Sequence, residues 1–332
     1  MRVDPFENVE LGGTGVTVTR LGMGLAPIGG LFAPVGDEAA VAAIDEAWRL
    51  GVRFFDTAPL YGAGLSERRA GAALRKRERA KYTIATKAGR RITAGSSVPE
   101  PREVTGMWAE TAGPGVAFDF SREGIRSSYR ESLERLGLDR TDVLHLHDPD
   151  DHYAEAVTSA LPELAELRRE GAVGAISAGM NQSAMLTDLA RTGLLDSVLL
   201  AGRYSLLDQS GLADLLPECR RRGISVIVGG VYNSGVLADP WQTTTYDYRP
   251  ASSRVVARAR AMARLCNRHG VPLRAAALQF PLAHPAVAAV LVGMRSAAEA
   301  SDAVAMARLP IPAALWRDLS DAWLLDPEIP VP

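Results

Sequence analysis

The sequence predicts an α/β protein built as a (β/α)8 TIM barrel over residues 1–332. Short apolar, β-branched runs recur eight times, and each is followed by a stretch with helical spacing and many Arg and Glu residues. No linker or change of composition interrupts this alternation. Eight parallel strand–helix units are therefore expected to close into one barrel rather than to form two domains.

Each apolar run predicts a strand, and each stretch after it predicts a helix. The strands are expected at Leu21–Ala26, Val52–Thr57, Tyr82–Lys87, Asp142–His147, Val173–Ala178, Ser197–Gly202, Ser225–Gly230 and Val287–Gly293. The helices are expected at Asp37–Leu50, Ser66–Arg79, Ser121–Leu136, Tyr153–Glu170, Gln182–Thr192, Gly211–Arg222, Ser252–His269 and Ala297–Met306. Val9–Thr19, with three glycines at its turn, is predicted to form a β-hairpin before the barrel.

Two long segments lie outside the alternation. Arg91–Phe120 follows the third strand, and Tyr232–Ala251 follows the seventh. Loops of this length in a compact domain are usually lids or binding loops. We therefore expect both to serve a site at the strand ends.

A doubly wound sheet is the competing architecture. It would normally carry Gly-x-Gly-x-x-Gly between its first strand and the helix that follows at once. Here Gly22 and Gly24 are followed by Pro27 at the third glycine position, and the helix begins only near Asp37. The sequence therefore lacks the dinucleotide fingerprint of that fold.

The composition is that of a globular protein, with 47% hydrophobic and 23% charged residues. The 37 basic and 39 acidic residues give a formal net charge of -2, which does not favour a nucleic-acid partner. No apolar stretch reaches the ~18 residues of a membrane span. Cys219 and Cys266 have no metal-ligand spacing and are expected to be buried thiols. We expect a cytoplasmic monomer or small homo-oligomer that acts on a small molecule.

Four reactive side chains stand at or just after the ends of three consecutive strands. Asp56 ends the second strand, Tyr61 follows five residues later, Lys87 ends the third and His147 ends the fourth. Singly, each has a structural explanation: a helix cap, loop packing, a solvated charge or a buried core histidine. Together they predict a catalytic site, because barrel enzymes place reacting groups at this rim.

These four residues could transfer a proton to or from a carbonyl/alcohol pair. A tyrosine with its ordinary pKa of ~10 is a poor base near neutrality, and a neighbouring lysine cation favours the phenolate. Asp56 is expected to hold Lys87 in place, and His147 to orient the substrate oxygen. None of the four can carry a hydride, so a redox reaction requires a nicotinamide cofactor.

The runs around these residues resemble those of the aldo-keto reductases. They are Phe55–Gly62, Ala85–Lys87 and Asp142–Pro149. Further segments are similar to the branch that includes the L-fucose and D-threo-aldose 1-dehydrogenases, and pyridoxal dehydrogenases share much of the pattern. These segments are His147–His152, Gly179–Gln182, Arg203–Asp208 and Tyr232–Gly235.

The resemblance implies an NAD(P)-dependent enzyme that oxidises an aldose at C1 to the lactone, with Tyr61 as general base. One alternative is a reductase of small aldehydes or ketones, and another is a pyridoxal 4-dehydrogenase. A third, which nothing in the sequence favours, is a non-catalytic nucleotide-sensing scaffold.

The resemblance also implies a cofactor site at the ends of the later strands. The nicotinamide amide is expected near the end of strand five, the pyrophosphate after strand seven, and the adenosine end at the turn into the last helix, whose free amides suit an anion. The residues are Gly179, Asn181, Gly230, Val231, Asn233, Gly235, Leu237, Gly293, Arg295, Ser296 and Glu299. Many family members stack a tyrosine from strand seven on the nicotinamide, but Gly229 or Gly230 stands there. Gly179-Met180-Asn181 replaces the usual Ser-Asn pair.

The sequence favours NAD over NADP. A 2′-phosphate needs cationic partners, and Arg295 is the only cation in the adenosine segment. Ser301 occupies the position of a second arginine in many phosphate-preferring relatives. Glu299 and Asp302 stand nearby, and a carboxylate suits a free ribose better than a phosphate.

Other polar and aromatic residues leave alternatives open. His145 and His147, with Asp148 and His152 nearby, could suggest a metal-dependent hydrolase, but the other strand ends supply no further ligands, and we expect no metal. By strand alternation His145 should lie one layer below His147. Trp108 could wall the substrate site or pack on its own loop, and His152 is a weaker substrate candidate.

Overall fold

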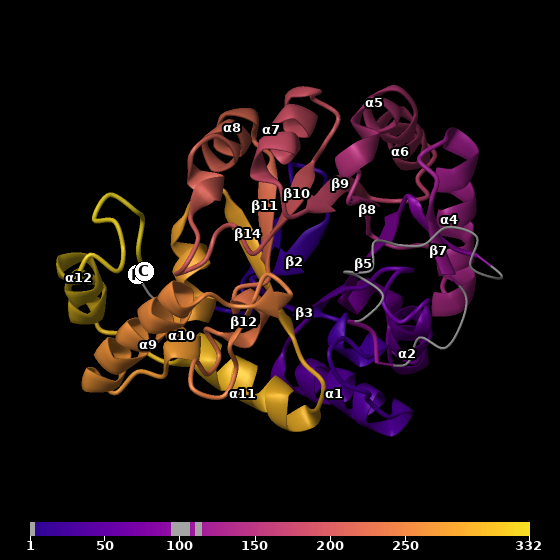
Figure 1. Ribbon diagram of the computed structural model, residues 1–332. Coiled ribbons are helices and arrows are strands. Elements are labelled where there is room, and N and C mark those ends of the chain that lie inside the picture. The colour runs from indigo at the N-terminus through magenta and orange to yellow at the C-terminus, as the bar shows by residue number, and fades with distance from the viewer. Residues whose placement is uncertain (1–3, 94–106, 110–114) are drawn as a thin grey trace.

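The computed structural model describes residues 4–93, 107–109 and 115–332, in which eight parallel strands form a closed barrel (Figure 1). Around the barrel they are β3 (Leu21–Gly24), β4 (Phe54–Asp56), β5 (Thr83–Ala88), β8 (Val143–His147), β9 (Ala175–Met180), β10 (Ser197–Ala201), β11 (Ser225–Gly229) and β14 (Val287–Gly293), which pairs with β3. All eight predicted strands are confirmed, with ends that shift by one or two residues. The (β/α)8 barrel predicted from the sequence is therefore confirmed.

The barrel interior is filled by every second residue of the strands. Its lower layer is apolar and includes Phe54, Ala85, Val143, Ala175, Leu199 and Ile227. Because side chains of a strand alternate between its faces, the residue two positions further on points inward again. On β4, β5 and β8 those residues are Asp56, Lys87 and His145. The alternation of side chains along these strands thus places polar groups inside the upper barrel.

The predicted N-terminal hairpin is present and lies against the opposite end of the barrel from the reactive residues. Its strands are β1 (Asn8–Glu10) and β2 (Thr17–Thr19). Leu11 and Val18 are fully buried in the same cluster as Phe54 and Val143. The hairpin therefore plugs the N-terminal end of the barrel.

Helices surround the barrel (Figure 1). They are α1 (Asp37–Leu50), α2 (Leu65–Leu74), α4 (Arg122–Leu136), α5 (Tyr153–Glu155) and α6 (Leu161–Arg169) joined by a π-helical turn, α7 (Ser183–Arg191), α8 (Leu215–Arg222), α9 (Ser253–Arg268), α10 (Leu273–Gln279), α11 (Ala297–Arg308) and α12 (Ala313–Asp321). α2 ends five residues before its predicted end at Arg79, because the charged residues after Leu74 have no apolar face to bury. α8 starts later than predicted, at Leu215, since Pro217 fits only in a first helical turn.

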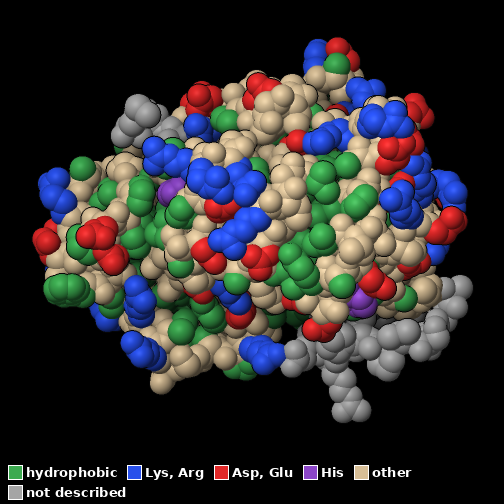
Figure 2. Space-filling model, turned by 90° about the horizontal axis from the view of Figure 1, so that it is seen from above, with side chains coloured by type: hydrophobic (Ala, Val, Ile, Leu, Met, Phe, Trp, Pro, Cys, Tyr) green, Lys and Arg blue, Asp and Glu red, His purple; other side chains and the backbone are tan. Residues whose placement is uncertain are grey.

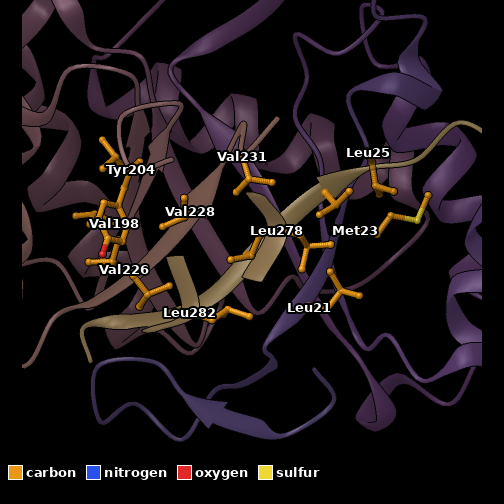
Figure 3. Close-up of a cluster of buried hydrophobic side chains, with 14 of the residues drawn as sticks. Leu21, Met23, Leu25, Val198, Tyr204, Val226, Val228, Val231, Leu278 and Leu282 are labelled. Atoms are coloured by element: carbon orange, nitrogen blue, oxygen red, sulfur yellow. The ribbon is translucent and has the colours of Figure 1, made fainter. Parts of the chain in front are cut away.

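Two helices, α10 and α12, were not predicted from the sequence. α10 consists mostly of alanine and leucine, so it shows no polar face and no helical period. Its Leu278 and the following Leu282 lie among the buried side chains of the barrel strands (Figure 3). The predicted helix over Ser252–His269 exists as α9, but α9 packs against α10 and α12. The short α10 thus contributes side chains to the core around the strands.

Both long segments contain short antiparallel ribbons that were not predicted. After β5, β6 (Arg90–Thr93) pairs with β7 (Gly115–Phe118). After β11, β12 (Thr245–Tyr246) pairs with β13 (Arg249–Pro250). The two-residue strands β12 and β13 are too short to leave a periodic signal in the sequence.

Candidate active site

Asp56 and Lys87 form a buried ion pair inside the upper barrel. Asp56 is 3% exposed and Lys87 is 2% exposed. Lys87 Nζ lies 2.6 Å from each carboxylate oxygen of Asp56. Lys87 also donates to the carbonyl of Thr57 at 3.0 Å. Burial alone would raise the pKa of Asp56, but the Lys87 cation and His145 hold that pKa below its ordinary value. The Asp56 carboxylate is therefore ionised near neutrality and is held in place by Lys87.

Tyr61 lies in the turn after β4, beside this pair. Lys87 Nζ is 5.2 Å from the centre of the Tyr61 ring, and the His147 ring meets it edge-on with centroids 6.0 Å apart. Burial raises the pKa of Tyr61 well above 10, and the Asp56 charge raises it further. From the sequence, the neighbouring Lys87 cation was expected to lower the pKa of Tyr61. Burial has the larger effect, so the pKa is raised instead. Tyr61 is thus a phenol, and a proton donor, at neutral pH.

His147 ends β8 at the same rim. Burial lowers the pKa of His147 well below its ordinary value, and the charges of Arg90 and Lys87 lower it further. The imidazole is therefore neutral near pH 7, with one ring nitrogen that donates and one that accepts. Its Nε2 lies 3.6 Å from a carboxylate oxygen of Asp148, which follows it in the chain. His147 can donate a hydrogen bond to a substrate oxygen without changing its charge.

His145 belongs to the charged cluster, which the sequence argument did not predict. It is fully buried, and its Nε2 lies 3.3 Å from Oδ1 of Asp56. Strand alternation correctly places it on the same face as His147. Its contact with Asp56 follows from the barrel register, in which His145 stands beside Lys87. Within the described residues no group of three potential metal ligands is found.

Aromatic side chains from four loops lie near the reactive group. The Trp108 ring stacks on Tyr61 with centroids 5.6 Å apart, and the Phe32 ring lies 6.0 Å from that of Tyr248. Phe32 donates its backbone N–H to Met107 next to Trp108, which ties the two pairs together. Phe32 and Tyr248, both partly exposed, were not predicted, because their placement depends on how two loops fold over the rim.

His152, the weaker substrate candidate, is held in a different environment. Its ring lies 5.1 Å from both the Phe118 and the Phe120 rings, and its Nδ1 is 3.1 Å from Glu155 Oε2. Within the described residues no contact joins His152 to Asp56, Tyr61, Lys87 or His147. The structure thus gives His152 a packing environment rather than a place among the reactive groups.

The residues expected to hold a cofactor lie at the ends of β9, β11 and β14, on the same rim. Gly179 is inside β9, and a Cβ added there would meet nothing closer than 3.5 Å, so space is open beside it. Asn233 is buried, and its side-chain Oδ1 has no hydrogen-bond partner within the described residues. Val231 and Leu237 are buried, whereas Gly230 and Gly235 have positive φ. An unpaired buried acceptor at this rim fits a polar ligand such as a dinucleotide.

The adenosine-end residues form the start of α11. Ser296 caps the helix by accepting the N–H of Glu299, and Gly293 ends β14. Arg295 donates from Nη2 and Nε to Glu299 at 2.6 and 3.0 Å, and this bond raises the pKa of Arg295. Arg295 is therefore already engaged by a carboxylate. Asn181 follows β9 and lies at the start of the turn into α7.

One cation near this region was not found from the sequence. Arg274, in α10, donates to both carboxylate oxygens of Asp302 at 2.8 Å. Ser301 instead donates to Glu46 of α1 at 2.7 Å. Arg274 is far from Asp302 in the chain, so only the packing of α10 on α11 reveals the pair.

On the face in Figure 2, Lys and Arg side chains are interspersed with Asp and Glu. None of the described helices has the length and apolar character to cross a membrane. Cys219 and Cys266 are buried free thiols, and burial raises the pKa of each to about 12.

Comparison with known proteins agrees with this geometry. The profile of the aldo/keto reductase family matches residues 20–323. The chain is 40% identical to the D-threo-aldose 1-dehydrogenase of a Pseudomonas species, over 94% of this chain and 96% of that relative. It is 38% identical to the pyridoxal 4-dehydrogenase of Microbacterium luteolum, over 98% of this chain and 100% of that relative.

A solved structure shows the same fold. The glycerol dehydrogenase of Gluconobacter oxydans superposes with a TM-score of 0.75 at 22% identity, covering 98% of this chain and 97% of that one. At this identity the likeness concerns the fold alone, and the family assignment rests on the profile and the sequence relatives. The protein is a member of the aldo/keto reductase family, an oxidoreductase that uses a nicotinamide cofactor.

Proposed function

We propose that the protein oxidises an aldose at its anomeric carbon to the lactone, with Tyr61 as the proton acceptor. The observation that carries the proposal is the arrangement of Asp56, Tyr61, Lys87 and His147 at one rim, three of them on adjacent strands. The 40% identity to a D-threo-aldose 1-dehydrogenase over nearly the whole chain supports an aldose as substrate.

The reaction balances with these residues and one hydride acceptor. The anomeric hydroxyl gives its proton to the ionised Tyr61 oxygen, while His147 donates a hydrogen bond to the substrate oxygen. The C1–H bond breaks as the C1=O bond of the lactone forms. The departing hydride needs an acceptor, which a bound nicotinamide supplies. Asp56 holds Lys87 in place beside Tyr61 throughout.

The cofactor is proposed to occupy the rim formed by the ends of β9, β11 and β14. We further propose a preference for NAD. Arg295 is engaged by Glu299 and Arg274 by Asp302, so a 2′-phosphate would have to compete with a carboxylate for either cation. Measured kcat/KM values for the two cofactors test this, and a tenfold preference for NADP, about 1.4 kcal/mol, would contradict it.

Two observations favour other substrates of the same chemistry. Tyr61 is protonated at neutral pH, which suits reduction of an aldehyde or ketone. The 38% identity to a pyridoxal 4-dehydrogenase favours pyridoxal. In that reaction the same groups would act on an aldehyde or its hemiacetal.

A substrate panel separates these possibilities. Purified protein is offered aldoses and pyridoxal with NAD or NADP, and small aldehydes with the reduced cofactors, with the reduced nicotinamide followed by absorbance. The proposal expects the highest kcat/KM with an aldose. A higher kcat/KM with pyridoxal or a small aldehyde would replace it, and nucleotide binding without any turnover would indicate a sensing scaffold.

A further inference from the structure

Asp148 has an unusual backbone conformation beside the reacting group. It follows His147 directly, and its φ of 43° lies in the left-handed region. Its backbone N–H donates to the carbonyl of Gly179 at 3.0 Å, which fixes this conformation to the end of β9. Strained backbone of this kind often marks a functional position when the surroundings hold it in place.

The Asp148 side chain is also fixed, by Arg90 at the start of β6. Arg90 Nη2 donates to Oδ2 of Asp148 at 2.9 Å, and the two side chains are 10% and 24% exposed. The guanidinium carbon of Arg90 also lies 4.8 Å from the centre of the Phe118 ring, a second contact that restrains the arginine. The second oxygen, Oδ1 of Asp148, receives no hydrogen bond from any described residue. One acceptor of an immobilised carboxylate is thus left for a ligand.

The Asp148 carboxylate lies next to His147. Oδ2 of Asp148 is 3.6 Å from Nε2 of His147, the nitrogen expected to contact the substrate oxygen. In an aldose, the hydroxyl on the carbon next to C1 lies about one hydrogen-bond length from the anomeric oxygen. It is therefore the hydrogen-bond donor of the substrate nearest to the anomeric oxygen, and it can reach Asp148 when that oxygen bonds to His147.

The surroundings of Asp148 also suit a sugar. Desolvation raises the pKa of Tyr248 to about 12, and the charge of Asp148 adds to the shift, so the two residues are neighbours. The Phe32 ring lies beside that of Tyr248, and Trp108 stacks on Tyr61. A carboxylate with aromatic rings nearby matches a ring that has hydroxyl edges and C–H faces.

We propose that Asp148, held by Arg90, determines specificity by accepting a hydrogen bond from the hydroxyl on the carbon next to the reacting one. The inference rests on the proposed function and narrows its substrate class to 2-hydroxy aldoses. Hydrogen bonds to a charged group contribute about tenfold to a hundredfold in affinity. A merely structural Arg90–Asp148 pair, tying β6 to β8, would not distinguish substrates by this hydroxyl.

The experiment compares an aldose with its 2-deoxy analogue, for example L-fucose and 2-deoxy-L-fucose. The ratio of their kcat/KM values is measured for the wild type, Asp148→Asn and Asp148→Gly. Asparagine and glycine both tolerate left-handed backbone, and two variants guard against a folding defect in one. Asp151→Asn is the matched control, because Asp151 is an exposed acidic residue of the same turn. Cofactor Kd and Tm are measured for each protein.

The wild type is expected to prefer the 2-hydroxy aldose, and both Asp148 variants to lose about tenfold or more of that preference. The loss of kcat/KM in the Asp148 variants should be larger for the 2-hydroxy aldose than for the 2-deoxy aldose, while the cofactor Kd and the Asp151→Asn ratio should change little. Equal losses on both sugars would overturn this inference while leaving aldose oxidation standing. A wild type that oxidises no aldose would overturn the proposed function and this inference together.

Discussion

The two halves of the barrel rim differ in the size of their inward side chains. β4, β5 and β8 carry Asp56, Lys87 and His147 at or next to their last residues, all polar and buried. On β9, β10, β11 and β14 the corresponding inward residues are Gly179, Ala201, Gly229 and Gly293, none larger than a methyl group. One half therefore supplies reactive groups, and the other supplies space beside them.

The glycines of the open half have different causes. A Cβ at Gly293 would lie 2.7 Å from Pro27, and Gly230 needs a φ of 65°. Gly179 and Gly229 have neither constraint, since an added Cβ would meet only ordinary contacts at 3.5 Å. The fold would tolerate alanine at these two positions. Their glycines fit a ligand that approaches the strands closely.

The largest effect is expected from a substitution that removes the proton-transfer group of the reactive half. Tyr61→Phe deletes one oxygen, and kcat/KM should fall by about 10²–10⁴-fold, the usual contribution of a general acid or base. Cofactor Kd, measured by fluorescence titration, should stay unchanged because the open half is intact. Tyr153→Phe, an exposed tyrosine of α5, is the control. Turnover of Tyr61→Phe near the wild-type rate would refute the assigned role.

Removing the buried cation should destabilise the whole fold. Lys87→Met leaves the Asp56 carboxylate buried without its partner, which costs about 3–5 kcal/mol of unfolding free energy. Lys81→Met breaks an ion pair whose side chains are 62% and 63% exposed, and should cost less than about 1 kcal/mol. Urea denaturation measures both variants. Similar losses in the two would show that Asp56 finds water or another partner.

Some parts of the site could be predicted from the sequence, and others could not. Asp56, Lys87 and His147 were found because strand ends and strand alternation locate inward residues without knowledge of the loops. The contact of His145 with Asp56 requires the barrel register, and the Arg274–Asp302 pair requires the packing of α10 on α11. Phe32 and Tyr248 require the path of two loops. The raised pKa of Tyr61 depends on burial, which residue types alone do not give.

The protonation of Tyr61 predicts a different pH dependence for each of the two reaction directions. Burial and the Asp56 charge raise the pKa of Tyr61, so the ionised form needed for oxidation is scarce at pH 7. Oxidative kcat/KM should therefore rise with pH, by up to about tenfold per unit, through pH 9. Reductive kcat/KM, which uses the phenol, should stay level over that range. An oxidation rate already level at pH 7 would mean that the pKa of Tyr61 is low during catalysis.

The smallest effect is expected from two substitutions that test whether the cofactor binds against the strands of the open half. Gly179→Ala and Gly229→Ala each add one methyl group where the protein itself has room, so Tm should stay within error of the wild type. If a nicotinamide ring lies against these strands, each methyl group crowds it at a cost of about 1–3 kcal/mol. Cofactor Kd should then rise by roughly tenfold to a hundredfold.

Gly36→Ala is the control for these two substitutions. Gly36 precedes α1 with a φ of -68° and no neighbour within 4 Å of an added Cβ, so alanine is equally tolerated there. Gly36 is not among the residues expected to hold the cofactor. The cofactor Kd of Gly36→Ala should therefore match that of the wild type. An unchanged Kd in Gly179→Ala and Gly229→Ala would place the cofactor elsewhere on the rim. A fall in Tm without a change in Kd would show that these glycines serve the packing of the barrel.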